Sequence, residues 1–564
     1  MIEQFFGYNH NLKNGYGEFY DTKNITSSYF PMLSTRHRRG LFSVSGDIKG
    51  LFSKDKIAYI ANRKLYYGGA EVTGLSFTGD KERTMISMGA YLIIFPDKVY
   101  VNTAKLSDYG SLEAKFVTSG TVTYSLSKID GTGYTYTGTK PLEPTDGDVW
   151  LDDDTLKEYS DYSSSWVNIL TTYIKIASPN IGKAFEQYDG VKISGSSDDY
   201  FNNTFIIQSK GDDFIVVIGL KSDFSQATPL TISRETPDID FLCEGENRIW
   251  GCNSKKNEIY ACKLGDFKNW NCFGGLSTDS YAVTVGSDGD FTGAIRYMSS
   301  ILFFKENYIH KIYNLNPPYN VTTSFTKGVQ KGSNKSLCVV NGSLFFMSST
   351  GVCRYEGSLT VPLDNVFGTI YYHSGVAGEF RNKYYICLSS GANKRELFVY
   401  DTQKGLWHKE DEIDISHFAT NNSNLYYVYK DGVKKLAMID SEQPYGTFTG
   451  QLSGYSQEND IEWSAETGLL GLDLEGYKYI RAMSVRLSIT PISDAGRVDI
   501  YVEYDSSGKW ELLDTIEAQK VHGAALRLSL NRRCDHIRLK LSGKGHCKVY
   551  SITLDVEEGS RYGR

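Results

Sequence analysis

The feature that most constrains this chain is a short β-hairpin unit that returns between residues 45 and 440. Each copy has an apolar strand, a tight polar turn and a second strand rich in Tyr or Phe. About seven copies can be recognised: KIAYIANRKLYYGG (56–69), AYLIIFPDKVYVN (90–102), NRIWGCNSKKNEIYACKL (247–264), MSSILFFKENYIHKIYN (298–314), LCVVNGSLFFMSSTGVCRYEG (337–357), KYYICLSSGANKRELFVYDTQKGLWHK (383–409) and NLYYVYKDGVKKLAMID (424–440). A single hairpin is only marginally stable, whereas blades stacked around a centre bury each other's faces. We therefore predict an irregular β-propeller of about seven blades, with a stack of β-sandwiches as the alternative.

The composition also favours many short strands joined by tight turns. The chain has 41 Tyr and 54 Gly but only 12 Pro and 8 Met. Tyr packs well on a pleated surface while its hydroxyl stays in water, and Gly suits the turns between short strands. Because a helical spacing of apolar residues persists almost nowhere for three turns, the predicted fold class is all-β.

Two regions depart from the hairpin pattern. Residues 116–235 interrupt it with strands such as TFIIQSK and DFIVVIG, which predict an inserted small β domain. After residue 460 the strands alternate apolar and polar residues, as a β-sandwich requires. The predicted organisation is an N-terminal segment with the first blades (1–115), the inserted domain (116–235), the remaining blades (236–440), a turn-rich linker (441–460) and a C-terminal β-sandwich (461–564).

Charge, cysteine use and the N-terminus exclude several classes of protein. The formal net charge is −7, without the basic excess of a sequence-specific DNA binder. The first residues show no basic segment followed by an apolar run, and no stretch has the roughly 18 apolar residues of a membrane helix. The nine Cys lack the close pair of a zinc site, so we expect buried thiols in a reducing cytoplasm.

Motifs of catalysis and cofactor binding are missing from the sequence. It contains no HExxH, no G-x-S-x-G and no P-loop. Asp152, Asp153 and Asp154 could bind Ca²⁺ or act in acid/base chemistry, and Asp288 with Asp290 could belong to a Ca²⁺ loop, but a solvated turn explains both groups. We therefore predict no enzyme activity, no cofactor and no metal.

Two surface features are candidates for binding. Arg36, Arg38 and Arg39 form the densest basic cluster, which could contact an acidic patch of a neighbouring subunit or DNA phosphates, or could lie in a solvated loop. Tyr pairs at 66–67, 371–372, 384–385 and 426–427 could stack on sugars. Neighbouring residues of a strand point to opposite faces, so we expect one Tyr of each pair in the core.

Several segments resemble virion proteins of tailed phages, in particular propeller-bearing nozzle and stabilisation proteins of the tail or neck. The resemblance is carried by YFPMLSTRHRRG (29–40), by GDFKNWNCFGG (265–275) with the blade after it, and most specifically by the C-terminal strands from WSAETGLLGLD onward. Segment 141–169 is similar to modules common in phage tail proteins. The resemblance implies an architectural role and leaves the position in the particle open.

The function expected from this resemblance is that of a structural virion component at the tail or neck, made in the host cytoplasm. Copies would form a homo-oligomeric ring around the DNA channel, because head-to-tail contacts close into rings. The implied partners are portal, adaptor or tail proteins, and genomic DNA passing without sequence specificity. The alternatives are a tail-tip receptor- or glycan-binding protein and a propeller glycosidase.

Overall fold

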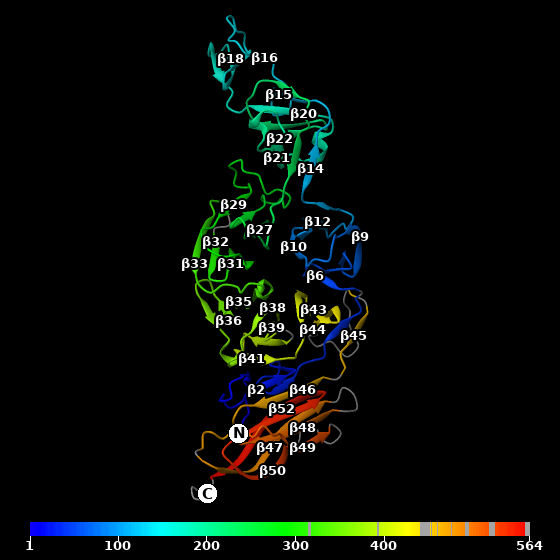
Figure 1. Cartoon of the computed structure of the whole chain (residues 1–564), viewed down its shortest axis with the longest axis vertical. Coiled ribbons are helices and arrows are strands. Elements are labelled where there is room, and N and C mark those ends of the chain that lie inside the picture. The colour runs from blue at the N-terminus through cyan, green and yellow to red at the C-terminus, as the bar shows by residue number, and fades with distance from the viewer. Residues whose placement is uncertain are drawn as a thin grey trace. The chain divides into compact units, whose positions relative to one another are not determined.

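The protein is almost entirely β-structure in a computed structural model, which describes all residues except 45, 314–316, 392–393, 423, 440–451, 453, 460, 475, 491–495, 518–524 and 559–564 (Figure 1). The described residues include four short 3-10 helices among the strands: η1 (Ile181–Ala184), η2 (Asp199–Phe201), η3 (Asn334–Ser336) and η4 (Asn365–Phe367). No helix within these residues is long and apolar enough to cross a membrane. The predicted all-β class is confirmed: a β-propeller carries an inserted small β domain and a C-terminal β-sandwich.

Small antiparallel sheets form the blades of the propeller. The described residues contain seven of them, and the exact blade number stays a prediction. The first four are β6 (Ile48–Ser53), β7 (Ile57–Ala61), β8 (Lys64–Tyr67) and β9 (Ala70–Ser76); β10 (Thr84–Met88), β11 (Tyr91–Phe95), β12 (Val99–Asn102) and β13 (Tyr109–Ser111); β26 (Phe241–Gly245), β27 (Arg248–Asn253), β28 (Glu258–Ala261) and β29 (Tyr281–Thr284); and β30 (Gly293–Tyr297), β31 (Ser300–Lys305), β32 (Tyr308–Tyr313) and β33 (Asn320–Phe325).

The remaining blade sheets follow in chain order, and the last one recruits two distant strands. They are β34 (Cys338–Val340), β35 (Ser343–Ser348), β36 (Gly351–Tyr355) and β37 (Thr360–Pro362); β38 (His373–Phe380), β39 (Lys383–Ser389), β40 (Arg395–Asp401) and β41 (Leu406–Lys409); and β42 (Ile415–Asn421), β43 (Asn424–Asp431) and β44 (Val433–Ile439) with β5 (Gly40–Phe42) and β45 (Tyr455–Gln457). Because β5 pairs with both β44 and β45, residues near the N-terminus complete the last blade.

Tight two-residue turns explain how the hairpins of the blades close. Both central residues have positive φ at 62–63, 246–247 and 381–382, the conformation of a type I′ turn. This turn matches the twist of the strands that it joins, and Asn tolerates positive φ better than most residues. Each of these turns contains an Asn, as the sequence shows.

The blades are packed on both faces, which alters the expectation for the paired tyrosines. All seven residues of β39 are buried. Tyr384 packs with Phe345 of the preceding sheet, whereas Tyr385 belongs to a cluster with Tyr427 of the following one. Both tyrosines at 384–385 and at 426–427 are therefore core residues, while the expectation of one core Tyr per pair is met at 66–67 and 371–372.

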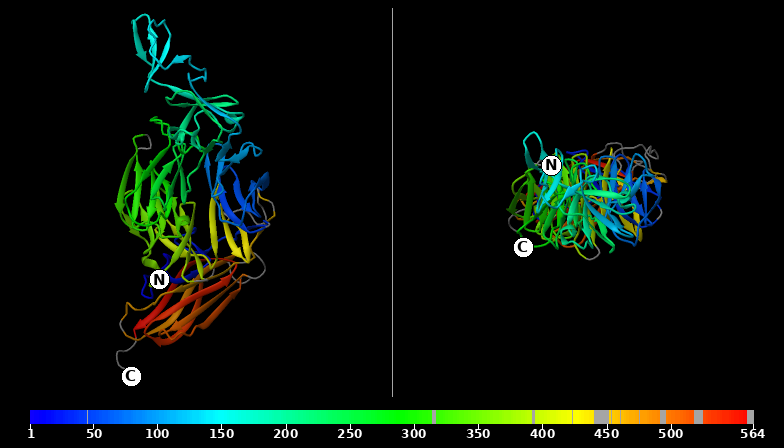
Figure 2. Two further views of the ribbon diagram at one scale, coloured as in Figure 1. Left: turned by 45° about the horizontal axis from the view of Figure 1, so that its top comes forward. Right: turned by 90° about the horizontal axis from the view of Figure 1, so that it is seen from above.

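The C-terminal sandwich consists of two sheets that share one apolar core. One sheet has the order β1 (Gly7–Tyr8), β2 (Glu18–Lys23), β46 (Glu462–Thr467), β51 (Ile537–Lys544), β48 (Arg497–Tyr504) and β49 (Glu511–Glu517). The other has the order β3 (Ile25–Thr26), β4 (Leu33–Thr35), β52 (His546–Glu558), β47 (Lys478–Thr490) and β50 (Ala525–Cys534). Strands from residues 7–35 thus belong to the sandwich, and Figure 2 shows these blue strands beside the orange and red ones. Most of the predicted linker 441–460 lies outside the described residues.

The inserted domain has its own apolar core, built from residues between 122 and 232. Its larger sheet has the order β14 (Ala114–Val117), β25 (Thr231–Arg234), β21 (Gly190–Ser194), β22 (Thr204–Lys210), β23 (Phe214–Ile218), β20 (Tyr173–Ala177), β15 (Val122–Ser127) and β24 (Phe224–Gln226). A smaller sheet contains β16 (Tyr136–Thr137), β17 (Val149–Asp152), β18 (Thr155–Ser160) and β19 (Ser165–Asn168). The first and last strands, β14 and β25, pair with each other, so the domain begins and ends at one place.

The chain forms two compact units. One contains residues 1–84, 302–311 and 322–564, and therefore holds the sandwich together with the last blade sheets and the first. The other contains residues 85–301 and 312–321, including the inserted domain. The candidate site described next lies entirely within the first unit.

Candidate functional site

The outer face of the six-stranded sandwich sheet carries ordered rows of polar side chains. Strand alternation sends Val498, Ile500 and Val502 into the core, so their neighbours on β48 point outward. The strand registers then define three rows across the sheet: Tyr501, Lys540, Glu466 and Asp21; Asp499, Ser542, Ser464 and Lys23; and Arg497, Lys544 and Glu462. The pairing of strands therefore brings residues from opposite ends of the chain onto one surface.

An aromatic cavity of about 470 Å³ opens on this face. Its aromatic lining includes Tyr501 and Trp510, both half-buried, and Trp510 comes just before β49. The cations of Arg538 and Lys540 lie 5.5 Å and 5.7 Å from the centroid of the Trp510 ring. A third aromatic residue, the buried Trp463, also lines the cavity, and the polar lining residues are Lys23, Glu462, Ser464, Arg497, Asp499, Lys540, Ser542 and Lys544.

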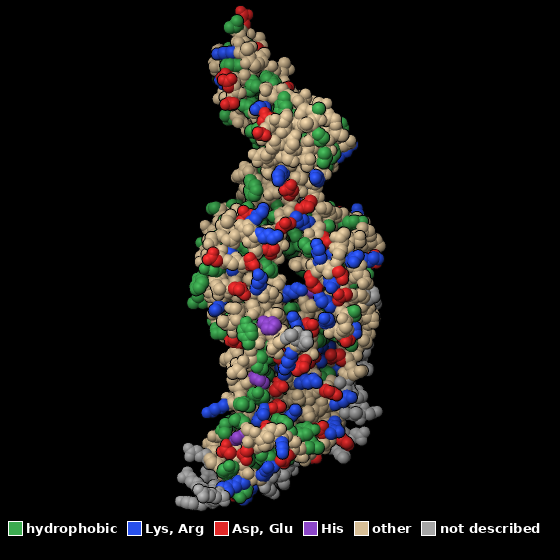
Figure 3. Space-filling model, viewed as in Figure 1, with side chains coloured by type: hydrophobic (Ala, Val, Ile, Leu, Met, Phe, Trp, Pro, Cys, Tyr) green, Lys and Arg blue, Asp and Glu red, His purple; other side chains and the backbone are tan. Residues whose placement is uncertain are grey.

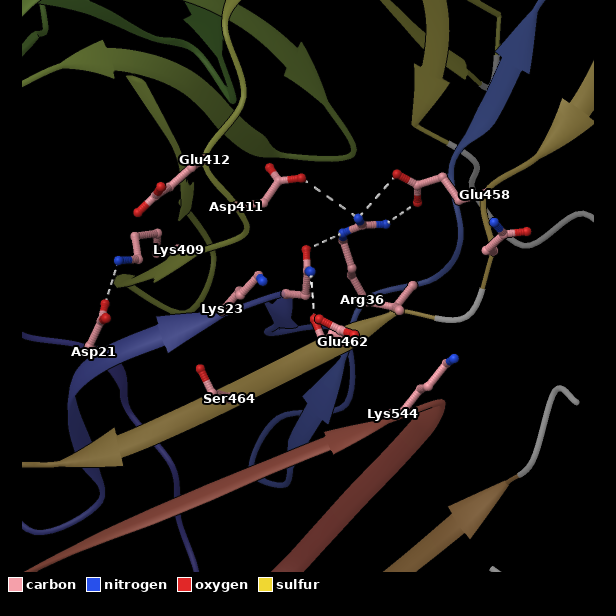
Figure 4. A pocket seen from close by; sticks show the side chains of 13 residues that line it. Asp21, Lys23, Arg36, Lys409, Asp411, Glu412, Glu458, Glu462, Ser464 and Lys544 are labelled. Carbon is pink, nitrogen blue, oxygen red and sulfur yellow. Dashed lines mark hydrogen bonds and ion pairs between the residues drawn. The ribbon is translucent and has the colours of Figure 1, made fainter. Parts of the chain in front are cut away.

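A charged cavity of about 820 Å³ continues from the aromatic one, and Lys23, Glu462, Ser464 and Lys544 line both. Its opposite wall is segment 409–412, which begins at the last residue of β41 in a blade sheet (Figure 4). The Lys409 amine binds the Asp21 carboxylate at 2.5 Å and so ties the blade to strand β2 of the sandwich. We refer to the two cavities together as the junction groove.

A buried ion-pair cluster closes one end of the charged cavity. Arg36 Nη1 lies 2.7 Å from Glu458 Oε2, and Arg39 binds Asp411 at 2.7 Å. Arg39 also pairs with the Glu410 carboxylate at 2.6 Å, which connects the cluster to the chain just after β41. Figure 4 shows Arg36 between Asp411 and Glu458.

Arg36 and Arg39 lower the pKa values of the carboxyl groups of Asp411 and Glu458. Burial acts to raise the pKa of Asp411, but Arg39 and Arg36 outweigh burial and hold this pKa below its ordinary value. Burial opposes Arg36 and Arg39 at Glu458 in the same way, and the pKa of Glu458 is also lowered. Both groups therefore stay ionised near neutral pH, so neither is suited to donate a proton as a general acid.

The structure places the predicted basic cluster inside the chain. Arg36 and Arg39 are 7% and 1% exposed, and their guanidinium groups bind carboxylates of the same chain. Arg38 donates from Nε to the backbone oxygen of Glu458 at 2.6 Å. A contact of Arg36, Arg38 and Arg39 with another subunit or with DNA stays a prediction, and all three have partners within their own chain.

Other residues singled out in the sequence do not assemble into a site. The Asp152 carboxylate binds Lys157 at 2.5 Å beside the β17–β18 turn, and Asp153 occupies that turn with φ of 47°. Among the described residues, no three His, Cys, Asp or Glu side chains are placed to hold a metal ion. All nine Cys are thiols outside any disulfide, and eight of them are buried, as expected for thiols that act as small apolar residues.

The aromatic residues of the groove were missed by the sequence reasoning, which considered only paired tyrosines for sugar stacking. A signal was available in VDIYVEY (498–504), where every second residue is apolar and the residues between them form the outer face. Trp510 has no such signal, because it lies in the turn between β48 and β49 and reaches the groove through the register of that hairpin.

Comparisons with known proteins bear on the architecture. No protein family model and no curated protein matches this chain. Similar solved structures include an exo-β-1,3-galactanase from Phanerochaete chrysosporium with galactose, at 10% identity, a TM-score of 0.22, and coverage of 55% of this chain and 95% of that one. They also include Hsv2 of Kluyvelomyces marxianus, at 8% identity, a TM-score of 0.24, and coverage of 65% and 96%. An engineered GH43 glycoside hydrolase matches at 8% identity, a TM-score of 0.19, and coverage of 56% and 97%.

These comparisons correct the expected function. The comparisons contradict the prediction of a phage tail or neck component: two of the structures named above are glycoside hydrolases, and none of the three is a virion protein. The same comparisons stand against the prediction that the chain is not an enzyme, since two of the structures named above are glycoside hydrolases. The predicted ring and its portal, adaptor or tail partners receive no support. At 8–10% identity, these structures assign no functional residue to this chain.

Proposed function

We propose that this protein binds a carbohydrate in the junction groove, with Trp510 and Tyr501 as the side chains that contact the sugar ring. The observation that carries the proposal is the aromatic cavity of about 470 Å³ on an open sheet face. A sugar ring has an apolar C–H surface and a rim of hydroxyl groups. Half-buried aromatic rings supply apolar area with a defined orientation, and convergent polar groups supply hydrogen bonds.

The polar rows of the sheet match the hydroxyl rim of a sugar. Ser464 and Ser542 are register partners in the middle of the face, and their hydroxyl groups can donate or accept hydrogen bonds. Asp499 provides acceptor oxygens beside them, and Lys540 and Lys544 provide donors. The adjoining charged cavity lengthens the groove and would hold further residues of an oligosaccharide.

The proposal concerns binding and assigns no hydrolytic step. Hydrolysis of a glycosidic bond normally needs one protonated and one ionised carboxyl group on opposite sides of the bond. In the charged cavity, the carboxyl groups of Asp411 and Glu458 both have lowered pKa values and both bind arginine. These two groups therefore hold the wall of the groove in place, and Trp510 and Tyr501 remain the residues to test.

The test is a binding measurement on a printed array of neutral and acidic oligosaccharides, followed by calorimetry with the strongest binder. Trp510→Ala and Tyr501→Ala should each weaken binding about tenfold, which corresponds to about 1.4 kcal/mol of lost contact. Tyr550→Ala removes a 40% exposed tyrosine of the opposite sheet and should bind like the wild type. Wild-type affinity in the Trp510 variant, with an intact fold, would contradict the proposal.

A further inference from the structure

The aromatic cavity is cationic, although the chain as a whole is acidic. Four cationic side chains and two acidic ones line it: Lys23, Arg497, Lys540 and Lys544, with Glu462 and Asp499. The whole chain has a formal charge of −7, so this balance is opposite to the average. Figure 3 shows basic and acidic side chains interspersed over the face in view, which makes a locally cationic cavity a distinct feature.

Three of these cations have no carboxylate partner among the described residues. Across the part of the chain that the structure describes, Lys23, Lys540 and Lys544 lie within 4.0 Å of no Asp or Glu oxygen, whereas many surface lysines of this protein do have one, as Lys98 does. Arg497 differs, because its guanidinium binds Asp499 on the same strand at 2.8 Å. The three amines therefore leave their charges available to a ligand in the groove.

The acidic side chains of the same face are mostly neutralised by their own partners. Asp21 binds Lys409, and Arg538 binds both Glu466 and Glu503. Asp499 is held by Arg497. Glu462 is the exception: its exposed carboxylate lines both cavities and is the register partner of Lys544. Because Arg538 carries one charge and binds two carboxylates, the uncompensated charge on this face is three amines against two carboxylates.

The position of Lys540 connects this charge with the aromatic residues. Its register partner on β48 is Tyr501, and its amine lies 5.7 Å from the centre of the Trp510 ring. A sugar that contacts these two rings would have a substituent at its edge close to the amine. A carboxylate at that position would form a charge-assisted hydrogen bond, which is roughly twice as strong as a neutral one.

We infer that the carbohydrate bound by this groove is an anionic glycan, a chain of uronic acid residues whose carboxylates contact Lys540, Lys544 and Lys23. The inference rests on the proposed carbohydrate binding at the same site and specifies its ligand class. The aromatic rings give contact with each sugar ring, and the unpaired amines select the acid over its uncharged counterpart. A neutral glycan would leave the three amines without partners and would gain nothing from them.

The experiment uses the full chain and an array on which oligomers of galacturonic, glucuronic and mannuronic acid are printed beside their methyl esters. Esterification removes the charge and keeps the sugar ring. We expect at least one acid to bind about tenfold or more tightly than its ester, and the difference to shrink when salt rises from 50 to 500 mM. Lys540→Gln with Lys544→Gln should abolish the preference, whereas Glu462→Gln should strengthen it.

The outcomes separate this inference from the proposed function. The wild type could bind acid and ester equally, and Trp510→Ala could lose binding to both. That result would overturn the inference that the ligand is anionic and would leave the proposed carbohydrate binding in place. Binding of neutral oligosaccharides alone would do the same. Failure of every acidic and neutral oligosaccharide to bind the folded wild type would overturn both. Lys435→Gln changes a lysine that pairs with Asp431 outside the groove, and this control should keep the wild-type preference.

Discussion

At the scale of single residues, His408 on β41 is a buried side chain whose ring lacks hydrogen-bond partners among the described residues. It is 1% exposed. Burial, with further contributions from Lys383 and Lys404, holds the pKa of His408 well below 6.5. The native state therefore keeps the ring neutral, whereas the unfolded chain takes up a proton as the pH falls below about 6.5.

This linkage gives a prediction for His408→Leu. As the pH falls below 6.5, His408 lowers the free energy of unfolding of the wild type by up to about 1.4 kcal/mol for each pH unit. The variant lacks this titrating group, so its free energy of unfolding should fall less over the same interval. At pH 8 the variant should be more stable by about 1–3 kcal/mol, because an unsatisfied buried polar group is gone. Urea midpoints at pH 8, 6 and 5 measure both effects. A slope of midpoint against pH equal to that of the wild type would contradict the prediction.

Part of the slope will remain in the His408 variant, because three other histidines act in the same direction. Burial, as the main cause, lowers the pKa of His310, His417 and His546 to about 4. Each of them stays neutral in the native state between pH 6.5 and 4, so each lowers the free energy of unfolding as the pH falls over that interval.

The buried ion pairs of Arg39 give a second prediction at the residue scale. Arg39→Met leaves the carboxylates of Glu410 and Asp411 without their closest cation, and removal of one partner from a buried pair costs about 3–5 kcal/mol. The unfolding free energy from urea titration measures the loss. Arg296→Met breaks an exposed pair with Glu246 and should cost less than about 1 kcal/mol. Equal losses in the two variants would show that the cluster contributes little.

At the scale of secondary-structure elements, strand β5 joins the N-terminal segment to the last blade. A Cβ atom at Gly40 would lie 2.6 Å from Tyr455 Cε2 and 3.1 Å from Met438 Cε. Gly40→Val should therefore destabilise the protein by about 1–3 kcal/mol, as overpacking does in a filled core. Gly286→Val is a matched control, because no atom lies within 4 Å of its added Cβ. Thermal melting compares the two, and equal melting temperatures would refute a tight fit of β5.

The elements differ in how far the sequence could predict them. The hairpin predicted at 56–69 is β7 with β8, and the strand predicted at 479–490 is β47, because local alternation and turn residues specify both. Strands β1 and β3 have two residues each, too few for any pattern, and they form only because partners in the sandwich bind them. The inserted domain was visible as an interruption of the hairpin pattern.

The candidate site was less predictable than the fold for the same physical reason. Arg36 was recognised as part of a basic cluster, but its partner Glu458 lies 422 positions away, so the sequence could not distinguish an internal pair from a surface for a partner. The polar rows of the groove depend on the registers of β2, β46, β51 and β48, which one-residue shifts would reverse. The alternation of apolar and polar residues in the sequence predicts where strands form. The pairing register between strands determines which side chains lie next to each other, and the sequence does not show it.

At the scale of the whole molecule, the inserted domain is attached in a way that should let it be removed. Its core contains only residues between 122 and 232, and its first and last strands pair with Ala114 opposite Arg234. Arg234 also binds Asp189 within the domain at 2.5 Å, while Asn269 of the adjoining chain donates to Asp189 at 2.8 Å. A self-contained core with adjacent ends is what allows a domain to fold independently.

We therefore expect a fragment of residues 112–236 to fold alone, and a chain in which a short Gly/Ser linker replaces residues 114–234 to keep the fold of the remainder. The fragment should show dispersed amide signals in NMR spectra and its own cooperative thermal transition, because its apolar core remains complete. A fragment of equal length, residues 150–274, lacks β14 and β15 and should be unfolded, since β24 loses its only neighbour in the sheet and β20 and β25 each lose one of two. A disordered 112–236 fragment would mean that contacts such as Asn269 with Asp189 are required for folding, and that the domain depends on the blades to which it is joined.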